Sequence, residues 1–279
     1  MVLNSVSDAL GAAVDALSAA GVDTPRLDAE LLLAEVTGRS RAQLAASPEA
    51  GVESAAGRAF AELVRRRLRR EPIAYILGRC GFRRIELRVD RRVLIPRPES
   101  ELLVELALEI QPRTVLDVGT GSGAVALAIA DELPQASIVA TDLYLDALEV
   151  AARNADWLGV SDRVRFEPGS LPASGVFDLL LANLPYVSGR EWLGLQPELR
   201  EFEPRGALTP GPTGLEAIEA LLGEFALRDD ISARAIGLEV GAGQAAIVAE
   251  LVRRAGFEEV TVRPDLAGID RVVVGEAGP

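Results

Sequence analysis

The second half of the chain alternates between short apolar runs and stretches with helical periodicity. The apolar runs are typical of buried strands and lie at 114–118, 137–141, 163–167, 177–182, 235–240, 258–263 and 270–275. Helical patterns fall near 123–132, 144–157, 214–228 and 243–255. Alternation of this kind predicts an α/β fold with a doubly wound sheet. Because only a short turn joins the last two runs, one of those strands should be antiparallel.

The first 70 residues predict a small bundle of helices. One helical pattern ends near Gly21 and consists of Val6, Leu10, Ala13, Val14 and Leu17. The next starts at Thr24-Pro25, repeats at Leu27, Leu31 and Ala34, and ends at Gly38. A third helix is expected from near Val52 to Arg70, with Phe60, Leu63, Val64 and Leu68 facing inward. This segment shows no catalytic constellation, so we expect it to recognise a partner.

Residues 71–98 have a different character. Glu71-Pro72 should end the preceding helix. Imperfect alternation of apolar residues, as in a β-hairpin, then follows at Phe82, Ile85, Leu87 and Val89. We therefore expect a helical substrate-recognition domain at 1–70, a β-hairpin linker at 71–98 and an α/β domain at 99–279.

Composition narrows the chemistry. Of the 279 residues, 49% are hydrophobic, which allows a sizeable core, but no apolar run is long enough to span a membrane. The N-terminus lacks a secretory signal, so a cytoplasmic protein is expected. The chain has one cysteine and no histidine, which excludes internal disulfides, Ser-His-Asp triads and most zinc sites. No metal is expected, and the chemistry must depend on carboxylates, amides, backbone groups or a cofactor.

The net charge of −13 argues against stable nucleic-acid binding. Arginines are nevertheless concentrated between Arg58 and Arg97. Such a strip is either a contact surface for RNA or an acidic protein, or a solvated helix face with ion pairs. We favour the second interpretation.

A glycine-rich turn follows the strand expected at 114–118. The segment Asp117-Val118-Gly119-Thr120-Gly121-Ser122-Gly123 leads from that strand into a helix. Glycines let the backbone approach a ligand, and the helix N-terminus favours anionic groups. Asp142 ends the next strand, where a carboxylate can accept hydrogen bonds from both hydroxyls of a ribose.

These features fit nicotinamide cofactors and S-adenosylmethionine, and three of them favour the methyl donor. The loop reads G-x-G-x-G rather than G-x-G-x-x-G. Asp117 precedes the first glycine by two residues, where it could bind the donor's ammonium group. The sheet is expected to end in an antiparallel strand.

The most informative segment is Asn183-Leu184-Pro185-Tyr186, which follows the apolar run Phe177–Ala182. Asn183 offers both an acceptor oxygen and a donor NH2 group. The proline biases Leu184 toward an extended conformation that presents its carbonyl outward. Two acceptors and a flat ring suit a planar NH2 group, such as that of glutamine, adenine or cytosine.

Taken together, these motifs resemble those of the PrmC/HemK family, the release-factor glutamine N5-methyltransferases. The resemblance covers nearly the whole chain. The further matching motifs are Glu71–Gly78, Ile95–Glu101 (with Ser100 for the usual Thr), Glu203–Leu208, Gly214-Leu215 and Gly268–Arg271. The resemblance implies a class I S-adenosylmethionine-dependent methyltransferase domain (Rossmann-like, with seven strands) after the helical domain and hairpin linker.

The resemblance also implies the reaction, which is methylation of the Gln in the Gly-Gly-Gln motif of class 1 peptide chain release factors. The residues implied for the cofactor are Asp117, Gly119, Thr120, Gly121, Ser122, Gly123, Asp142, Leu143, Ser170, Leu171 and Asn183. Those implied for catalysis are Asn183, Leu184, Pro185 and Tyr186, with the Asn183 side-chain oxygen and the Leu184 carbonyl accepting the two amide hydrogens.

The chain departs from the family pattern at two places. Leu184 replaces the usual first proline, which loosens preorganisation by ~1 kcal/mol. Gly169-Ser170-Leu171 lacks the acidic and aromatic pair that often flanks the adenine. Because Asn-Leu-Pro-Tyr also occurs in adenine dimethyltransferases of ribosomal RNA, an adenine N6-methyltransferase acting on RNA or DNA is the alternative. A cofactor-binding scaffold without catalysis is a third.

Overall fold

The computed structural model describes residues 3–278. The chain folds into two compact units, unit 1 at Met1–Gly78 and unit 2 at Arg79–Pro279. Among the described residues, no helix has both the length and the apolar character needed to cross a bilayer.

Unit 1 is a helical bundle with a small β-ladder. Its helices are α1 (Val6–Ala19), α2 (Pro25–Thr37), α3 (Arg41–Ala46), α4 (Ser54–Leu68) and α5 (Ile73–Leu77). β1 (Leu3–Ser5) pairs antiparallel with β2 (Gly51–Val52). Ser5 starts α1 with a reciprocal capping box to Asp8. The three long helices follow the predicted ones, whereas α3, α5 and the ladder were not predicted.

The buried face of α2 differs from the predicted repeat. Leu27 is 38% exposed, and the buried residues are Asp28, Ala29, Leu32 and Leu33. Asp28 is buried because Arg67 of α4 donates a hydrogen bond to it from Nε at 2.6 Å. The buried face of α2 therefore follows the apolar repeat Ala29, Leu32 and Leu33 together with a buried ion pair, which apolar periodicity does not reveal.

Unit 2 is built on a seven-stranded sheet with the order β10-β11-β9-β8-β5-β6-β7. Its strands are β5 (Thr114–Val118), β6 (Ser137–Asp142), β7 (Val164–Pro168), β8 (Gly175–Ala182), β9 (Ile231–Glu239), β10 (Glu259–Pro264) and β11 (Asp270–Glu276). β11 is antiparallel to both neighbours, β9 and β10. The pairs β9-β8, β8-β5, β5-β6 and β6-β7 are parallel. The predicted doubly wound sheet with an antiparallel strand is confirmed.

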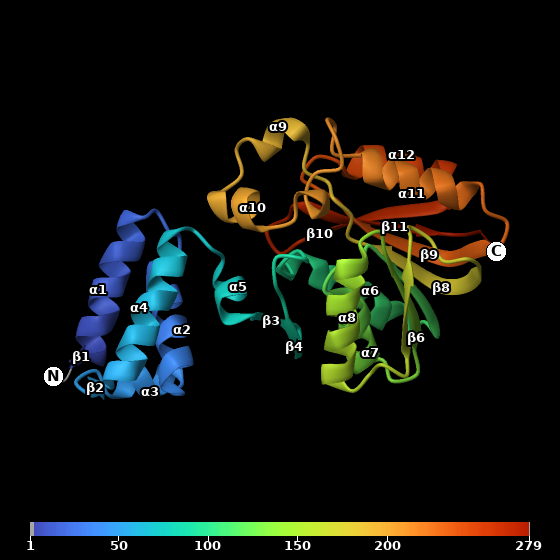
Figure 1. Ribbon diagram of the computed structural model, residues 1–279. Helices are drawn as coiled ribbons and strands as arrows, with labels where there is room; N and C mark the ends of the chain where they lie inside the picture. Colours follow the sequence, from blue (N-terminus) through green and yellow to red (C-terminus); the bar gives the residue numbers. More distant parts are fainter. Residues whose placement is uncertain (1–2, 279) are drawn as a thin grey trace. The chain divides into compact units, whose positions relative to one another are not determined.

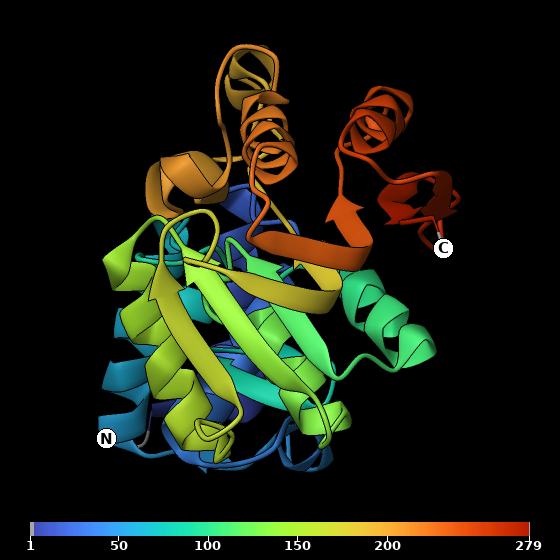
Figure 2. The same ribbon diagram turned by 90° about the vertical axis from the view of Figure 1, so that its right-hand side faces the viewer.

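Helices cover both faces of this sheet (Figure 1). One apolar core includes residues of α6 (Glu101–Ile110), α7 (Ala124–Glu132) and α8 (Leu145–Leu158). The other includes residues of α11 (Glu216–Ala226) and α12 (Ala245–Arg254), which lie together on one side of the strands in Figure 2. Short helical turns complete the unit: η1 (Pro98–Ser100), α9 (Gly189–Trp192), α10 (Pro197–Phe202) and η2 (Arg205–Ala207). α9 and α10 were not predicted.

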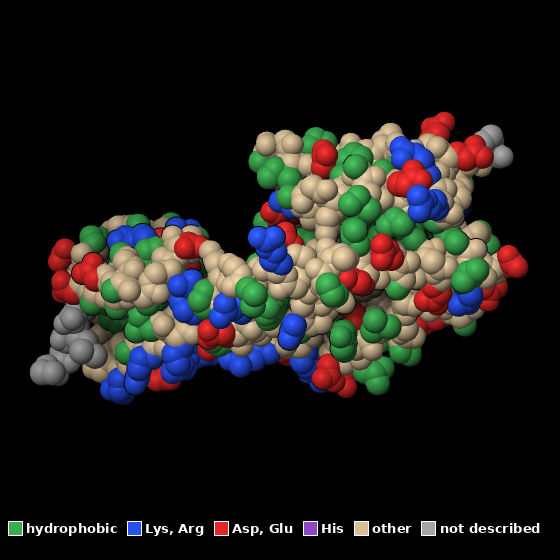
Figure 3. Space-filling model, turned by 90° about the horizontal axis from the view of Figure 1, so that it is seen from above, with side chains coloured by type: hydrophobic (Ala, Val, Ile, Leu, Met, Phe, Trp, Pro, Cys, Tyr) green, Lys and Arg blue, Asp and Glu red, His purple; other side chains and the backbone are tan. Residues whose placement is uncertain are grey.

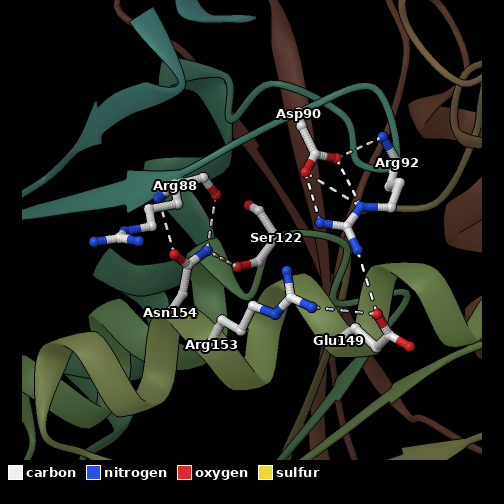
Figure 4. Close-up of polar contacts among 7 residues, drawn as sticks. All are labelled: Arg88, Asp90, Arg92, Ser122, Glu149, Arg153 and Asn154. Carbon is white, nitrogen blue, oxygen red and sulfur yellow. Dashed lines mark hydrogen bonds and ion pairs between the residues drawn. The ribbon is translucent and has the colours of Figure 1, made fainter.

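The expected β-hairpin consists of β3 (Arg79–Phe82) and β4 (Ile85–Arg88). Asn154 of α8 connects it to the glycine-rich turn (Figure 4). The Asn154 Oδ1 accepts from the Arg88 N–H at 2.8 Å. Its Nδ2 donates to the carbonyls of Arg88 at 3.0 Å and Ser122 at 2.9 Å. One fully buried amide thus fixes the end of β4 against the turn that follows β5.

The arginine-rich strip contains many ion pairs. Within unit 1, Arg66 pairs with Glu71 at 2.7 Å. In unit 2, Arg92 pairs with Asp90 at 2.6 Å and with Glu149 at 3.3 Å, as Figure 4 shows. Figure 3 shows blue side chains close to red ones, together with a run of blue along one edge of unit 1. The pairing supports the interpretation of a solvated face with ion pairs.

Candidate active site

The site lies where the parallel strands β5, β6, β8 and β9 end at the same edge of the sheet. Each of these strands ends in, or is followed at once by, a polar side chain: Asp117 near the end of β5, Asp142 on β6, Asn183 after β8 and Glu239 on β9. This edge is where ligands bind in open α/β sheets.

The turn after β5 depends on glycine. Gly119, Gly121 and Gly123 have φ values of 72°, 56° and 84°. A Cβ on Gly119 would lie 2.9 Å from Leu184 Cδ2, too close for an ordinary contact. The Gly119 and Thr120 N–H groups both donate to the Thr141 carbonyl at 2.9 Å, so the loop is held against the end of β6.

Asp117 is a buried carboxylate beneath this turn. It is 2% exposed and accepts a hydrogen bond from Thr120 Oγ1 at 2.6 Å. Burial raises the pKa of Asp117 to about 6, and the hydrogen bond from Thr120 opposes the rise. A cationic group that binds here would stabilise the ionised form of Asp117, which burial destabilises.

Asp142 supports the same turn from β6. Its Oδ2 accepts from the Gly121 N–H, and its Oδ1 accepts from the Tyr144 N–H, both at 2.9 Å. Burial raises the pKa of Asp142, and these backbone donors oppose the rise. The carboxylate keeps lone-pair capacity to accept a further donor from a ligand.

Asn183 follows β8 and is held by residues far away in the sequence. Its Nδ2 donates to Ser100 Oγ at 2.8 Å, and Ser100 Oγ donates to Glu239 Oε2 at 2.6 Å. The Tyr186 hydroxyl donates to Glu239 Oε1 at 3.3 Å, while the Tyr186 carbonyl accepts from Gln244 Nε2 at 3.0 Å. Burial raises the pKa of Glu239 to about 7 and also raises that of Tyr186.

A small pocket opens to solvent at this edge. It is lined by Leu94, Pro96, Arg97, Ser100, Asp117, Gly119, Thr120, Gly121, Ser122, Ala124, Val125 and Asn183. Six of the residues singled out from the sequence, from Asp117 to Asn183, therefore share one space. Asp142 adjoins it through its bond to Gly121.

Three other residues predicted for the cofactor, Leu143, Ser170 and Leu171, lie beyond this lining. Leu143 is 71% exposed, and Leu171 is buried. The Ser170 carbonyl accepts from Thr141 Oγ1 at 2.9 Å, while its hydroxyl is bonded to Glu224. These three residues follow β6 and β7, on the side of Asp142.

Sequence reasoning missed three side chains of the site: Glu239, Gln244 and Glu203. Glu203 accepts from the Ile95 N–H at 3.1 Å and is paired with Arg97, which joins two of the family motifs. Ser100 was noted as a departure within a family motif and not as a site residue. Glu239 had a usable signal, because an acid at the end of a buried apolar strand repeats the pattern of Asp117 and Asp142.

Solved structures similar in fold include methyltransferases. The hMettl16 catalytic domain in complex with a MAT2A 3′UTR hairpin has a TM-score of 0.56 at 15% identity, covering 69% of this chain and 76% of that chain. A methyltransferase from Pyrococcus furiosus has a TM-score of 0.51 at 17% identity, covering 69% and 89%. At these identities the likeness shows the fold alone, and the class I methyltransferase fold is confirmed.

Sequence comparisons cover more of the chain. The family model for the PrmC N-terminal domain matches residues 8–78, and that for the methyltransferase small domain matches residues 98–196. A release factor glutamine methyltransferase of Rhodopirellula baltica is 41% identical over 268 residues, covering 91% of this chain and 90% of the relative. The release factor glutamine methyltransferase of Bordetella pertussis is 45% identical over 259 residues, covering 90% of this chain and 94% of the relative. With such similarity over most of its length, the chain belongs to the family of release factor glutamine methyltransferases.

Proposed function

We propose that this protein transfers the methyl group of S-adenosylmethionine to the side-chain amide N5 of a glutamine. The glutamine is the one in the Gly-Gly-Gln motif of class 1 peptide chain release factors. The observation that carries the proposal is the pocket, which Asn183 lines together with Asp117 and Gly119. An amide-binding side chain and a loop suited to a cofactor thus share one space. The names of the relatives support the same reaction.

The residues at this edge of the sheet fit S-adenosylmethionine. Gly119, Thr120, Gly121, Ser122 and Gly123 form a loop that admits close approach of a ligand to the backbone. The buried carboxylate of Asp117 would bind the ammonium group, and Asp142 would accept from the ribose hydroxyls. On the far side of Asp142, the adenine would lie near Leu143, Ser170 and Leu171. The N-terminal domain of human METTL16, solved in complex with SAH, has the same fold at a TM-score of 0.50.

When bound, this cofactor supplies a methyl group that is already activated by a positively charged sulfur. An amide nitrogen is a poor nucleophile because its lone pair is delocalised, so the protein must align and polarise it. The Asn183 side-chain oxygen and the Leu184 carbonyl would accept hydrogen bonds from the two N–H groups of the substrate amide. They would also stabilise the positive charge that develops on its nitrogen. Pro185 keeps Leu184 extended, and Tyr186 would pack beside the amide. Once the nitrogen has gained the methyl group from sulfur, it loses one of its two protons to water, so no strong base is needed before transfer, which suits a chain without histidine.

The planar NH2 group of adenine could donate hydrogen bonds to the same two oxygens. The molecule that receives the methyl group must therefore be identified directly. We expect a class 1 release factor, incubated with the protein and isotopically labelled cofactor, to gain one methyl group on its Gly-Gly-Gln peptide by mass spectrometry. A release factor with Ala in place of that Gln should gain none. Methylation of adenine in RNA or DNA instead would reject the proposal. If no product forms under single-turnover conditions, the remaining interpretation is a cofactor-binding scaffold without catalysis. Because release factors act in translation, we also place the protein in the cytoplasm.

Asp142→Ala is expected to weaken S-adenosylmethionine binding by about 2 kcal/mol, because a charged hydrogen-bond acceptor for the ribose is lost. Titration calorimetry measures this as a higher dissociation constant. Asp131→Ala, which removes an exposed carboxylate near the end of α7, serves as the matched control and should bind as the unaltered protein does. An unchanged dissociation constant for Asp142→Ala would refute the ribose role.

A further inference from the structure

The side-chain amide of Asn183 has two polar ends, and only one of them suits the proposed reaction. A substrate NH2 group needs an acceptor, so the oxygen must face it and the Asn183 NH2 group must face elsewhere. If the amide were rotated by half a turn, the Asn183 NH2 group would face the substrate NH2 group, and no hydrogen bond could form between them. The chain therefore needs a device that distinguishes these two orientations.

The surroundings of Ser100 provide this distinction. Ser100 is buried at the junction of η1 and α6, and its hydroxyl has one hydrogen and two lone pairs. The hydrogen is donated to Glu239 Oε2 at 2.6 Å. Only lone pairs then remain to face Asn183, so the group that meets them at 2.8 Å must be the Asn183 NH2.

Glu239 is fixed in turn by a second donor. It is 1% exposed, and the Tyr186 hydroxyl donates to its other oxygen at 3.3 Å. When Glu239 is ionised, both of its oxygens accept, so the hydrogen of Ser100 then has an acceptor that is already held in place by Tyr186. The same carboxylate thereby positions Tyr186 directly and Asn183 through Ser100.

We propose that Ser100 and Glu239 are positioning residues that set the orientation of the Asn183 amide, so that its oxygen faces the methyl acceptor. The proposal rests on the function proposed above and adds to it. It assigns a purpose to the hydroxyl of Ser100, whose hydrogen bonds are made to Asn183 and Glu239.

Ser100→Ala tests this directly, because alanine suits the start of α6 but neither donates nor accepts. We expect the single-turnover rate of methyl transfer to a release factor to fall about 10-fold or more. The dissociation constant of S-adenosylmethionine should change by a smaller factor than this rate, because the bonds that hold the glycine-rich turn to Thr141 and Asp142 do not involve Ser100. Ser100→Thr keeps the hydroxyl and should restore most of the rate. A wild-type rate in Ser100→Ala would overturn the proposal.

A double-mutant cycle separates positioning from general support of the fold. If Ser100 acts through Asn183, Ser100→Ala should not slow the residual transfer of the Asn183→Ala variant any further. Equal losses in both backgrounds would show that Ser100 supports the fold alone and would reject the proposal. Should Ser100→Ala fail to fold, Ser100→Cys replaces the hydroxyl by a weak donor of similar shape, and the same cycle applies. Failure of the unaltered protein to methylate the release factor would reject the proposed function itself, a separate result.

Discussion

Asn183→Ala is expected to lower kcat/KM for release factor methylation by about 3 kcal/mol or more, a factor on the order of 100 or above. The variant loses the oxygen that would hold the amide nitrogen and stabilise the charge that develops on it. Because this charge exists only in the transition state, most of the loss should appear in kcat. Initial rates of methyl transfer to a purified release factor, over a range of substrate concentrations, measure both constants.

Gln135→Ala is the matched control for this substitution. It also removes an amide side chain, but an exposed one that precedes β6, at the opposite edge of the sheet from the pocket. We expect its kcat and KM to equal those of the unaltered protein. Near-normal turnover of Asn183→Ala would rule out the role given to Asn183, whereas a higher KM with unchanged kcat would restrict it to substrate binding.

The strands of the sheet could be predicted because burial on both faces leaves a simple signal. β5 and β8 lie inside the sheet, where Val115 packs into one core and Leu116 into the other. Such strands are therefore almost continuously apolar. The antiparallel strand was predictable for another reason, since the short turn before β11 leaves no room for a crossover helix.

The short helices could not be predicted in the same way. α3, α5, α9 and α10 are too short to show helical periodicity. The burial of Asp28 on α2 depends on its pairing with Arg67, which is far away in the sequence. Local patterns carry no information on such long-range partners.

The same distinction applies to the site. The turn at Gly119 and the motif at Asn183 are contiguous segments whose residue types indicate a cofactor and a planar amide. The connection between them is not contiguous, because Ser100 begins α6 while Glu239 ends β9. Only the fold brings this hydroxyl and this carboxylate together behind Asn183. The sequence therefore indicates which groups are used, and the three-dimensional structure indicates what orients them.

Glu239→Gln is expected to change how the stability of unit 2 depends on pH. Burial raises the pKa of Glu239 to about 7 in the folded protein, from the ordinary value of 4.5. The folded state therefore binds a proton more tightly than the unfolded state, and this contribution to stability is complete below pH 4.5 and lost as the pH rises through 7. The contribution should change by about 2–3 kcal/mol between pH 5 and pH 8, whereas glutamine does not titrate.

As the pH rises from about 5 to 8, the free energy of unfolding of the variant should therefore increase by this amount relative to that of the unaltered protein. This relative change does not depend on the absolute stability of the variant. Both tryptophans, Trp157 and Trp192, lie in unit 2, so their fluorescence during denaturant unfolding reports the relevant free energy. Glu219→Gln, which removes an exposed carboxylate on α11, should leave the difference from the unaltered protein constant over the same range. If the Glu239→Gln and unaltered curves run parallel, the Glu239 carboxyl titrates as it does in the unfolded chain. Its burial behind Ser100 and Tyr186 would then carry no electrostatic cost.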